Sequence, residues 1–343
     1  MRYRLFGTRT GLRVSSIALG GAMFGNSGGY GAEPAAVREM LDTYITAGGN
    51  FIDTSDQYQG GQSEQLIGEC IAGRRNELVL ATKYTFTHSR SSAIAMLGNS
   101  RKAMIQAVEA SLKRLRTDRI DLYLAHAADN ITPVEEIMRG FEDLTRAGKI
   151  IYGGLSNFPA WRIATAATLA DLRSWAPLTC VQLEYSLLSR AAERELLPMA
   201  SGFGLGVLGY SPLAGGVLTG KYRKGETGRV THFTGTAPGT QHDAILDQLF
   251  AIAEATGANA GQVAIAWAAA KGVIPVIGPR TVAQLEDNLG VANVQLTVEQ
   301  INKLDEVSAI TLGYPHELLE AQQARLAAGQ PELVEALGSR GVV

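Results

Sequence analysis

The sequence predicts a closed (β/α)8 TIM barrel with an N-terminal hairpin and a C-terminal extension. Eight short apolar runs recur along the chain, and each is followed by a turn and a helical pattern. The runs are continuous rather than alternating, which is typical of parallel strands that are buried on both faces. No low-complexity linker divides the chain, so we expect residues 1–343 to form a single domain with an elaborated loop at 212–239 and an extension at 311–343.

The first expected element is a small hairpin at residues 3–14. The eight barrel strands are expected at 17–20, 51–53, 78–83, 120–124, 150–155, 179–182, 205–208 and 273–276. Strands that alternate with helices in this way fit a closed barrel better than an open doubly wound sheet.

Helices are predicted in the gaps between the strands from caps and apolar spacing. Asn99 and Ser100 can cap a helix whose Met104, Val108 and Leu112 fall on one face. Further helix starts are expected at Thr132 with Pro133, at Thr281 and at Thr297.

Composition excludes several classes of protein. Apolar residues make up 46% of the chain and charged residues 19%, which supplies a large core and excludes a disordered chain. The chain holds 31 Lys and Arg against 33 Asp and Glu, so we expect neither a nucleic-acid nor a membrane partner. The N-terminus lacks an apolar export segment, and we expect a cytoplasmic protein. Two cysteines, Cys70 and Cys180, and scattered histidines indicate no metal site.

A glycine motif at 204–209 matches the dinucleotide fingerprint G-x-G-x-x-G letter for letter. The fingerprint needs its glycines in a turn between a strand and a helix, whereas these lie before and inside a predicted strand. Tyr210, Ser211 and Pro212 follow in place of a helix. We therefore interpret the glycines as small residues that let a barrel strand pack closely.

Polar residues at the ends of consecutive strands form the candidate catalytic set. Asp53 ends the second strand, Tyr58 lies in the loop after it, Lys83 ends the third strand, and His126 follows the fourth. Each alone has an ordinary explanation, such as a loop cap, a surface charge or a buried histidine with its hydrogen bonds satisfied. In a parallel barrel, however, the carboxyl ends of the strands open on one face, so the four should converge.

These four residue types can protonate a carbonyl oxygen. A free tyrosine has a pKa of about 10, and a nearby Lys83 cation is expected to lower the pKa of Tyr58 while Asp53 holds the ammonium in place. Tyr58 could then act as a general acid, and a neutral His126 could orient the same oxygen. No side chain supplies a hydride, so a complete reduction needs a cofactor.

Segments along most of the chain resemble the aldo-keto reductase family. In barrel order they are NFIDTSDQY (50–58), SEQLIG (63–68), IDLYLAH (120–126), GLSNF (154–158), QLEYS (182–186), YSPL (210–213), LTGK (218–221) and IPVIGPR (274–280). The match runs from about residue 3 to 310 and is highly specific.

The resemblance implies an NADPH-dependent oxidoreductase that reduces an aldehyde or ketone to an alcohol. It implies the catalytic tetrad Asp53, Tyr58, Lys83 and His126. The residues implied to contact the cofactor are Gly21, Ala22, Met23, Asp53, Ser156, Asn157, Gln182, Tyr210, Ser211, Leu213, Gly215, Lys221, Gly278, Arg280, Gln284, Asp287 and Asn288. Among these, Ser156, Asn157 and Gln182 are implied to hold the nicotinamide carboxamide and Tyr210 to stack on its ring.

The region around Arg280 favours a bound phosphate independently of the resemblance. Backbone N–H groups at the helix start capped by Thr281 attract anions. Arg280 suits a 2′-phosphate through a bidentate contact, which favours NADPH over NADH. The alternative is that Arg280 is a solvated surface charge.

The expected substrate pocket departs from the family pattern. Ala127 follows His126, where many relatives carry a tryptophan, so an aromatic wall is missing. The other walls are expected from Phe24, Tyr30, Tyr84, the loop at 84–100 and the stretch at 311–343.

Two other classes of function fit parts of the pattern. Some relatives, such as potassium-channel beta subunits, hold the cofactor and serve chiefly as partners of another protein. A lyase would instead use Lys83 as a Schiff-base nucleophile. Pairing with Asp53 would oppose that role by keeping Lys83 protonated, and it would leave the cofactor-site residues unexplained.

Overall fold

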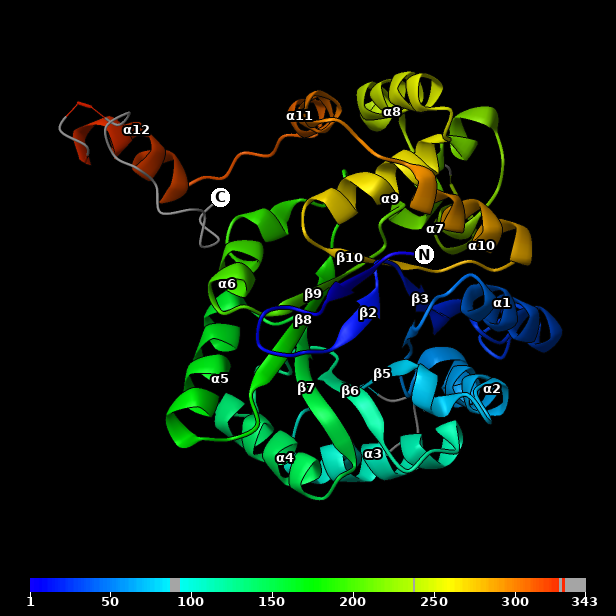
Figure 1. Cartoon of the computed structure of the whole chain (residues 1–343), viewed down its shortest axis with the longest axis vertical. Coiled ribbons are helices and arrows are strands. Elements are labelled where there is room, and N and C mark those ends of the chain that lie inside the picture. Colours follow the sequence, from blue (N-terminus) through cyan, green and yellow to red (C-terminus); the bar gives the residue numbers. More distant parts are fainter. Residues whose placement is uncertain (87–92, 237, 327–328, 331–343) are drawn as a thin grey trace.

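Eight parallel strands close into a barrel, in the order β10-β3-β4-β5-β6-β7-β8-β9, and helices surround it (Figure 1). The computed structural model describes residues 1–86, 93–236, 238–326 and 329–330. The barrel strands are β3 (Ala18–Gly20), β4 (Phe51–Asp53), β5 (Val79–Tyr84), β6 (Ile120–Ala125), β7 (Ile150–Ser156), β8 (Leu178–Glu184), β9 (Gly206–Tyr210) and β10 (Ile274–Ile277). The predicted (β/α)8 fold and all eight predicted strands are confirmed.

Apolar strand residues contribute to two layers of core. The larger layer lies between the strands and the helices. Strand residues that alternate with those of the larger layer, such as Phe51 beside Ile52, belong to a second, smaller cluster. The smaller cluster consists of Phe6, Val14, Ala18, Phe51, Val79, Ala81, Leu122, Leu124, Cys180, Leu208, Ile274 and Val276. Continuous apolar runs are what such a doubly buried strand requires.

The helices follow the strands in chain order. They are α1 (Pro34–Thr46), α2 (Gln62–Cys70), α3 (Arg101–Leu115), α4 (Val134–Arg146), α5 (Ala160–Arg173), α6 (Leu196–Gly202), α7 (Arg229–Thr234), α8 (Asp243–Thr256), α9 (Ala260–Ala270), α10 (Val282–Leu289), α11 (Val298–Val307) and α12 (His316–Leu326). Helix α12 lies outside the ring that the other helices form (Figure 1).

Three predicted helix caps are confirmed. The side chains of Ser100, Thr281 and Thr297 each accept a hydrogen bond from a backbone N–H in the first turn of α3, α10 and α11. Each bond satisfies one of the N–H groups that a helix start leaves without a partner inside the helix.

Two polar residues expected as caps have other partners. Asn99 donates through its side chain to the carbonyl of Ala127. Helix α4 does begin after Thr132, but Pro133 occupies the cap position and the Thr132 hydroxyl donates to Asp129. A carboxylate is a stronger acceptor than a neutral group, and the loop brings this one within reach of Thr132.

The predicted N-terminal hairpin is confirmed as the antiparallel pair β1 (Tyr3–Leu5) and β2 (Arg13–Ser15), drawn in blue across the centre of the barrel in Figure 1. Phe6 follows β1 and packs edge-on against Phe51, with ring centroids 5.3 Å apart. An added Cβ at Gly206 would lie 2.7 Å from the Phe6 ring. This close approach supports the interpretation of the glycines at 204–209 as packing residues.

The segment at 212–239 carries its own short helices. It contains the 3-10 helices η6 (Ala214–Thr219) and η7 (Lys221–Lys224), followed by α7. The expected extension at 311–343 contains α12, and residues 327–328 and 331–343 lie outside the described part of the chain.

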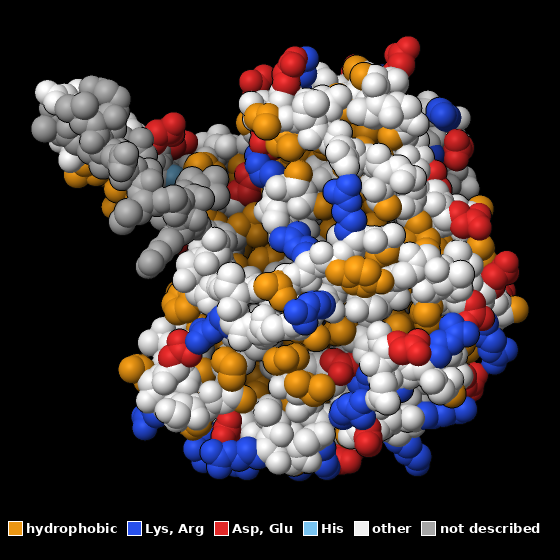
Figure 2. All heavy atoms as spheres, in the orientation of Figure 1, with side chains coloured by type: hydrophobic (Ala, Val, Ile, Leu, Met, Phe, Trp, Pro, Cys, Tyr) orange, Lys and Arg blue, Asp and Glu red, His pale blue; other side chains and the backbone are white. Residues whose placement is uncertain are grey.

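Charged side chains of both signs are interspersed around the visible face of the molecule (Figure 2). Within the described ranges, none of the helices has the length and apolar character needed to cross a membrane.

Gly206→Ala is expected to lower the free energy of unfolding by about 1–3 kcal/mol, because the new Cβ would overpack against the buried Phe6 ring. Urea unfolding measures this change. Gly202→Ala is the matched control, since no atom lies within 4 Å of a Cβ built at Gly202 at the end of α6. An equal loss in both variants would contradict the packing role of Gly206.

Candidate active site

The carboxyl ends of β4, β5 and β6 bring the four expected residues together. Asp53 is the last residue of β4, Lys83 lies near the end of β5, and His126 follows β6 directly. Tyr58 begins the 3-10 helix η2 (Tyr58–Gly61) after β4. Parallel pairing of the three neighbouring strands aligns their ends, so the loops meet at one mouth of the barrel.

A buried ion pair lies at the centre of this group. Lys83 Nζ lies 2.7 Å from Asp53 Oδ2 and donates a second hydrogen bond, also 2.7 Å long, to the carbonyl oxygen of Thr54. The Lys83 side chain is 0% exposed and that of Asp53 3%. Gln182, at the end of β8, donates its Nε2 to the other Asp53 oxygen at 2.8 Å. Each charge is therefore hydrogen-bonded in several directions, as a buried charge requires.

Tyr58 lies next to the Lys83 ammonium. Lys83 Nζ donates to the Tyr58 hydroxyl at 3.4 Å. Burial raises the pKa of Tyr58, and although the Lys83 charge opposes this shift, the net direction is upwards. The expected net lowering of the Tyr58 pKa is therefore wrong, because burial of the phenol outweighs the cation. At neutral pH Tyr58 is protonated.

Lys83 keeps its proton as well. Burial lowers the pKa of Lys83, but the Asp53 carboxylate and Tyr58 outweigh burial and raise that pKa above its ordinary value. An amine in this state is not a free nucleophile.

His126 meets Tyr58 edge-on, with ring centroids 5.7 Å apart. Burial, with a smaller contribution from the Lys83 charge, lowers the pKa of His126 to about 3. The imidazole is therefore neutral at physiological pH. Its Nδ1 lies 3.1 Å from the hydroxyl oxygen of Ser55.

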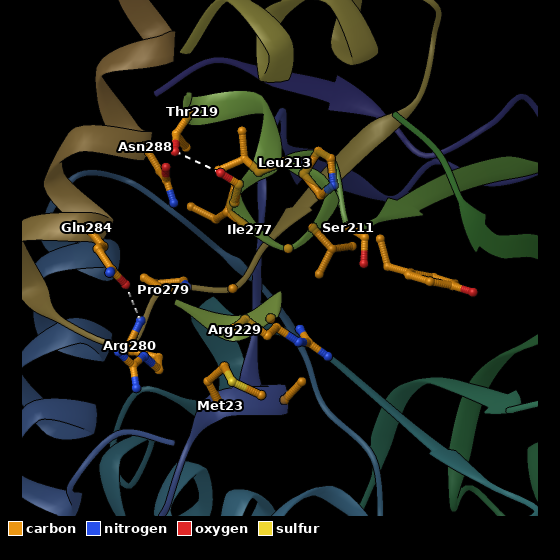
Figure 3. Close-up of a pocket in the computed structure, with 18 of the residues that line it drawn as sticks. Met23, Ser211, Leu213, Thr219, Arg229, Ile277, Pro279, Arg280, Gln284 and Asn288 are labelled. Atoms are coloured by element: carbon orange, nitrogen blue, oxygen red, sulfur yellow. Dashed lines mark hydrogen bonds between the residues drawn. The ribbon is translucent and has the colours of Figure 1, made fainter. Parts of the chain in front are cut away.

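A cavity of about 620 Å³ extends from these residues to α10. Figure 3 shows lining residues from Met23 and Ser211 to Gln284 and Asn288 of α10. The lining of the cavity includes Asp53, Tyr58 and His126 at one end. Of the residues expected around a cofactor, those that line it are Ala22, Met23, Asp53, Asn157, Gln182, Tyr210, Ser211, Leu213, Gly215, Lys221, Gly278, Arg280, Gln284, Asp287 and Asn288. Gly21 and Ser156 do not line it; both are buried, and the Ser156 hydroxyl accepts a hydrogen bond from Asn157 Nδ2.

Amide and phenol groups line the part of the cavity near the tetrad. Asn157 holds the Tyr210 hydroxyl through a 2.9 Å hydrogen bond to its Oδ1. Its Nδ2 donates to the backbone carbonyl of His126. These bonds fix the positions of Asn157 and Tyr210 at the mouth of the barrel.

Cations line the far part of the cavity. Burial and the neighbouring Arg280 charge lower the pKa of Lys221. The Arg280 guanidinium lies over the Tyr30 ring, 4.1 Å from its centroid, and is therefore held rather than freely solvated. Two cations that repel each other across a cavity favour an anion bound between them.

Tyr30 also connects two loops beside the cavity. Its ring stacks on His232 of α7 with centroids 4.3 Å apart, and it meets Phe233 edge-on. The segment after β3 is thereby joined to the elaborated loop at 212–239.

Several expected substrate walls lie elsewhere. Phe24 and Tyr84 are fully buried, and Tyr84 stacks on Tyr123, so the expectation that they line the pocket is wrong. Tyr30 does line the cavity. None of the described residues of 311–343 does so, and residues 87–92 of the expected 84–100 wall lie outside the described part of the chain.

Sequence reasoning missed Arg229 and Ser55 at this site, whereas Phe86 lies within the expected wall at 84–100. Phe86 is 45% exposed and meets the His126 ring edge-on, with ring centroids 5.2 Å apart. Arg229 of α7 projects into the cavity near Met23 (Figure 3). Ser55 contacts the His126 ring. Arg229 lies in the elaborated loop at 212–239, which the sequence did not assign to a pocket wall, and Ser55 lies inside the motif at 50–58.

Metal-ligating residues do not gather at the site. In the described part of the chain, no group of three or more His, Cys, Asp or Glu side chains is arranged to hold a metal ion.

Comparison with known proteins adds an independent observation. A family model described as "Aldo/keto reductase family" matches residues 16–309. The chain is 38% identical to the uncharacterized oxidoreductase YrpG of Bacillus subtilis, over 90% of this chain and 96% of that protein. It is 34% identical to the norsolorinic acid reductase of Aspergillus flavus, over 92% of this chain and 84% of that protein. It is 33% identical to the putative aryl-alcohol dehydrogenase AAD14 of Saccharomyces cerevisiae, over 93% and 89% respectively.

Lys83→Met is expected to remove enzymatic activity and to lower the free energy of unfolding by about 3–5 kcal/mol, because it leaves the Asp53 charge buried without its cation. Urea unfolding and a turnover assay on the same preparation measure both effects. Lys303→Met, which removes an exposed lysine from a pair with Glu299, is the control and should leave both nearly unchanged. A stable and active Lys83→Met protein would show that the pair is dispensable.

Proposed function

The chain belongs to the aldo/keto reductase family and is an oxidoreductase, and from this premise we propose that it reduces an aldehyde or ketone to an alcohol with NADPH. The observation that carries the proposal is the contact of Tyr58 with the Lys83–Asp53 pair, beside a neutral His126. Protonated phenol, fixed cation and neutral imidazole are the groups that protonation of a carbonyl oxygen needs. As part of the proposal the enzyme is cytoplasmic and its partner is a small-molecule carbonyl substrate.

The cavity fits a nicotinamide dinucleotide. Near the tetrad, Asn157 and Gln182 offer amide groups and Tyr210 an aromatic face, which suit a carboxamide and a planar ring. At the far part, Lys221 and Arg280 offer positive charge, which suits phosphate. In our proposal the residues that hold the cofactor are the cavity-lining residues together with Gly21 and Ser156 behind them.

When bound, the nicotinamide cofactor supplies the hydride for the carbonyl carbon. Tyr58 donates its hydroxyl proton to the carbonyl oxygen as negative charge develops there. The raised pKa of Tyr58 keeps this proton in place before reaction, and Lys83 stabilises the phenolate that remains after transfer. His126, neutral, holds the same oxygen by a hydrogen bond and fixes the substrate against Tyr58.

Asp53 acts through Lys83. It keeps the ammonium charged and holds it within 3.4 Å of the Tyr58 hydroxyl. Because Gln182 holds the second Asp53 oxygen, the carboxylate cannot rotate away without breaking a buried hydrogen bond.

The two alternative functions receive less support. Raised basicity of Lys83 opposes Schiff-base chemistry, because the protonated amine does not attack a carbonyl. A cofactor-holding partner subunit, like the potassium-channel beta subunits, would show no turnover. A steady-state assay with a panel of aldehydes and ketones distinguishes that role from the proposed reductase.

Tyr58→Phe is expected to reduce kcat for carbonyl reduction by about 10²- to 10⁴-fold, because the ring remains and the proton donor is lost. The affinity for NADPH, measured by fluorescence titration, should stay nearly the same. Tyr314→Phe, an exposed tyrosine outside the cavity, is the control for loss of a phenol elsewhere. Near-wild-type turnover of Tyr58→Phe would remove Tyr58 from the mechanism.

Arg280→Ala is expected to raise the Kd for NADPH by about ten- to a hundredfold, which is the loss of a contact worth about 1.5–3 kcal/mol. NADH has no 2′-phosphate, so its Kd should hardly change. Fluorescence titrations with both coenzymes at fixed ionic strength measure the difference.

Arg223→Ala is the matched control for this test. Arg223 lies in η7 and pairs with Asp243 and Asp247. Its substitution by alanine therefore removes the same charge from a residue that does not line the cavity. Equal weakening of both coenzymes by Arg280→Ala would assign Arg280 to a shared part of the cofactor, and no change would return it to the role of a surface charge.

A further inference from the structure

Ser55 links His126 to a second acidic residue that the proposed mechanism does not use. The Ser55 hydroxyl oxygen lies 3.1 Å from His126 Nδ1 and 3.2 Å from Asp56 Oδ1. Ser55 is fully buried, and Asp56 and His126 are 7% and 8% exposed. The three side chains therefore form a hydrogen-bonded chain directly behind the reacting face of the imidazole.

The Ser55 hydroxyl couples the hydrogen bonding of Asp56 to that of His126. Ser55 has one proton to donate and lone pairs to accept with, so it can donate towards only one neighbour at a time. The Lys83 carbonyl is a third neighbour, but at 3.5 Å it is a weaker acceptor than either Asp56 or His126. The protonation of Asp56 therefore decides towards which end of the chain Ser55 donates.

Among the described residues, Asp56 is the carboxyl group of its cluster to which no cation is directly bonded. The fully buried Glu64 carboxylate accepts a hydrogen bond from Arg114 Nε at 2.6 Å and another from the Thr82 hydroxyl at 2.6 Å. One cation thus serves two buried carboxyl groups, and it is bonded to Glu64. Where like charges share a buried site, the group without a close cation takes up a proton most easily.

The charges around the chain agree with this assignment. Burial, followed by the Glu64 charge, raises the pKa of Asp56 to about 7, against the opposing effect of Arg114. Within the described part of the chain, the titratable or charged groups that face Asp56 or His126 from the surrounding elements are Tyr58 of η2, Glu64 of α2, Lys83 of β5, Arg114 of α3 and Tyr123 of β6. Of these, Tyr58, Lys83 and Tyr123 have pKa values raised above their ordinary values and stay protonated near neutral pH.

We propose that Asp56 is a positioning residue that sets, through Ser55, which ring nitrogen of His126 carries the proton. With Asp56 ionised, Ser55 donates to the carboxylate and accepts from His126 Nδ1–H, which leaves Nε2 as an acceptor. With Asp56 protonated, its O–H donates to Ser55, Ser55 donates to Nδ1, and the imidazole proton lies on Nε2. The second state holds one proton more, on Asp56, and the imidazole is neutral in both.

The consequence for catalysis rests on the proposed function. With Nδ1 held by Ser55, Nε2 is the nitrogen available to an oxygen atom in the cavity. A carbonyl oxygen needs a donor there, so reduction is favoured when Asp56 is protonated. An alcohol can donate to Nε2, so oxidation is favoured when Asp56 is ionised.

Nuclear magnetic resonance of the ¹⁵N-labelled protein tests the proposal without turnover. Long-range ¹H–¹⁵N correlations distinguish the two imidazole tautomers, and comparison with His126→Gln assigns the ring among the five histidines. In the wild type, from about pH 5 to about pH 9, the proton is expected to move from Nε2 to Nδ1. The midpoint should lie near the pKa of Asp56, about 7.

Two variants and one control complete the test. Asp56→Asn and Ser55→Ala should each make the His126 tautomer independent of pH. Asp129 is near His126 in the sequence, but its carboxylate bonds to Asn99 and Thr132. Asp129→Asn should therefore keep the wild-type titration. In a turnover assay, kcat/KM for reduction should fall as pH rises above about 7 in the wild type and lose this fall in Asp56→Asn.

A proton that stays on one nitrogen throughout the wild-type titration would overturn the proposal. So would a pH-dependent tautomer that persists in either Asp56→Asn or Ser55→Ala. An intact titration in a protein that reduces no carbonyl would support the coupling and would count against the reductase function instead.

Discussion

The buried pair of Lys83 and Asp53 is the constraint on which the rest of the site depends. Two charges without access to water are tolerated only when every polar atom around them is bonded. Neighbouring strands of a parallel barrel meet this requirement, because β4 ends beside β5, with Asp53 opposite Ala81, and the backbone carbonyl of Thr54 is available there. Gln182 completes the arrangement from the other side of the barrel. Burial sets the direction of the pKa shifts of Tyr58 and His126, and the Lys83 charge acts on both groups as the second contribution.

Much of the fold follows from patterns that a linear sequence displays. Doubly buried strands require continuous apolar runs, and side-chain caps require short polar residues, so the eight strands and the caps at Ser100, Thr281 and Thr297 could be predicted. The cap expected at Thr132 failed because a carboxylate competes for its hydroxyl, and the loop that brings Asp129 near is a three-dimensional feature.

The convergence of the catalytic set could be predicted because it depends on strand ends alone, whereas its electrostatics could not. The direction of the Tyr58 pKa depends on how much water reaches the phenol, which no spacing reveals. Phe24, Tyr84 and Tyr30 are all aromatic residues at expected wall positions, yet Phe24 and Tyr84 are buried in the core and Tyr30 lines the cavity. Arg229 comes from α7, which contacts Tyr30 through His232 and Phe233, and such tertiary contacts are not visible in a local pattern.

The stack of Arg280, Tyr30 and His232 has a kinetic meaning. It joins the segment after β3 to α7, two walls of the cavity that are far apart in sequence. Loops that are joined by side-chain contacts separate only when those contacts break, and loop opening commonly occurs in microseconds to milliseconds. The rate at which these two walls separate is then expected to depend on three aromatic or planar side chains that take no part in the proposed proton transfer.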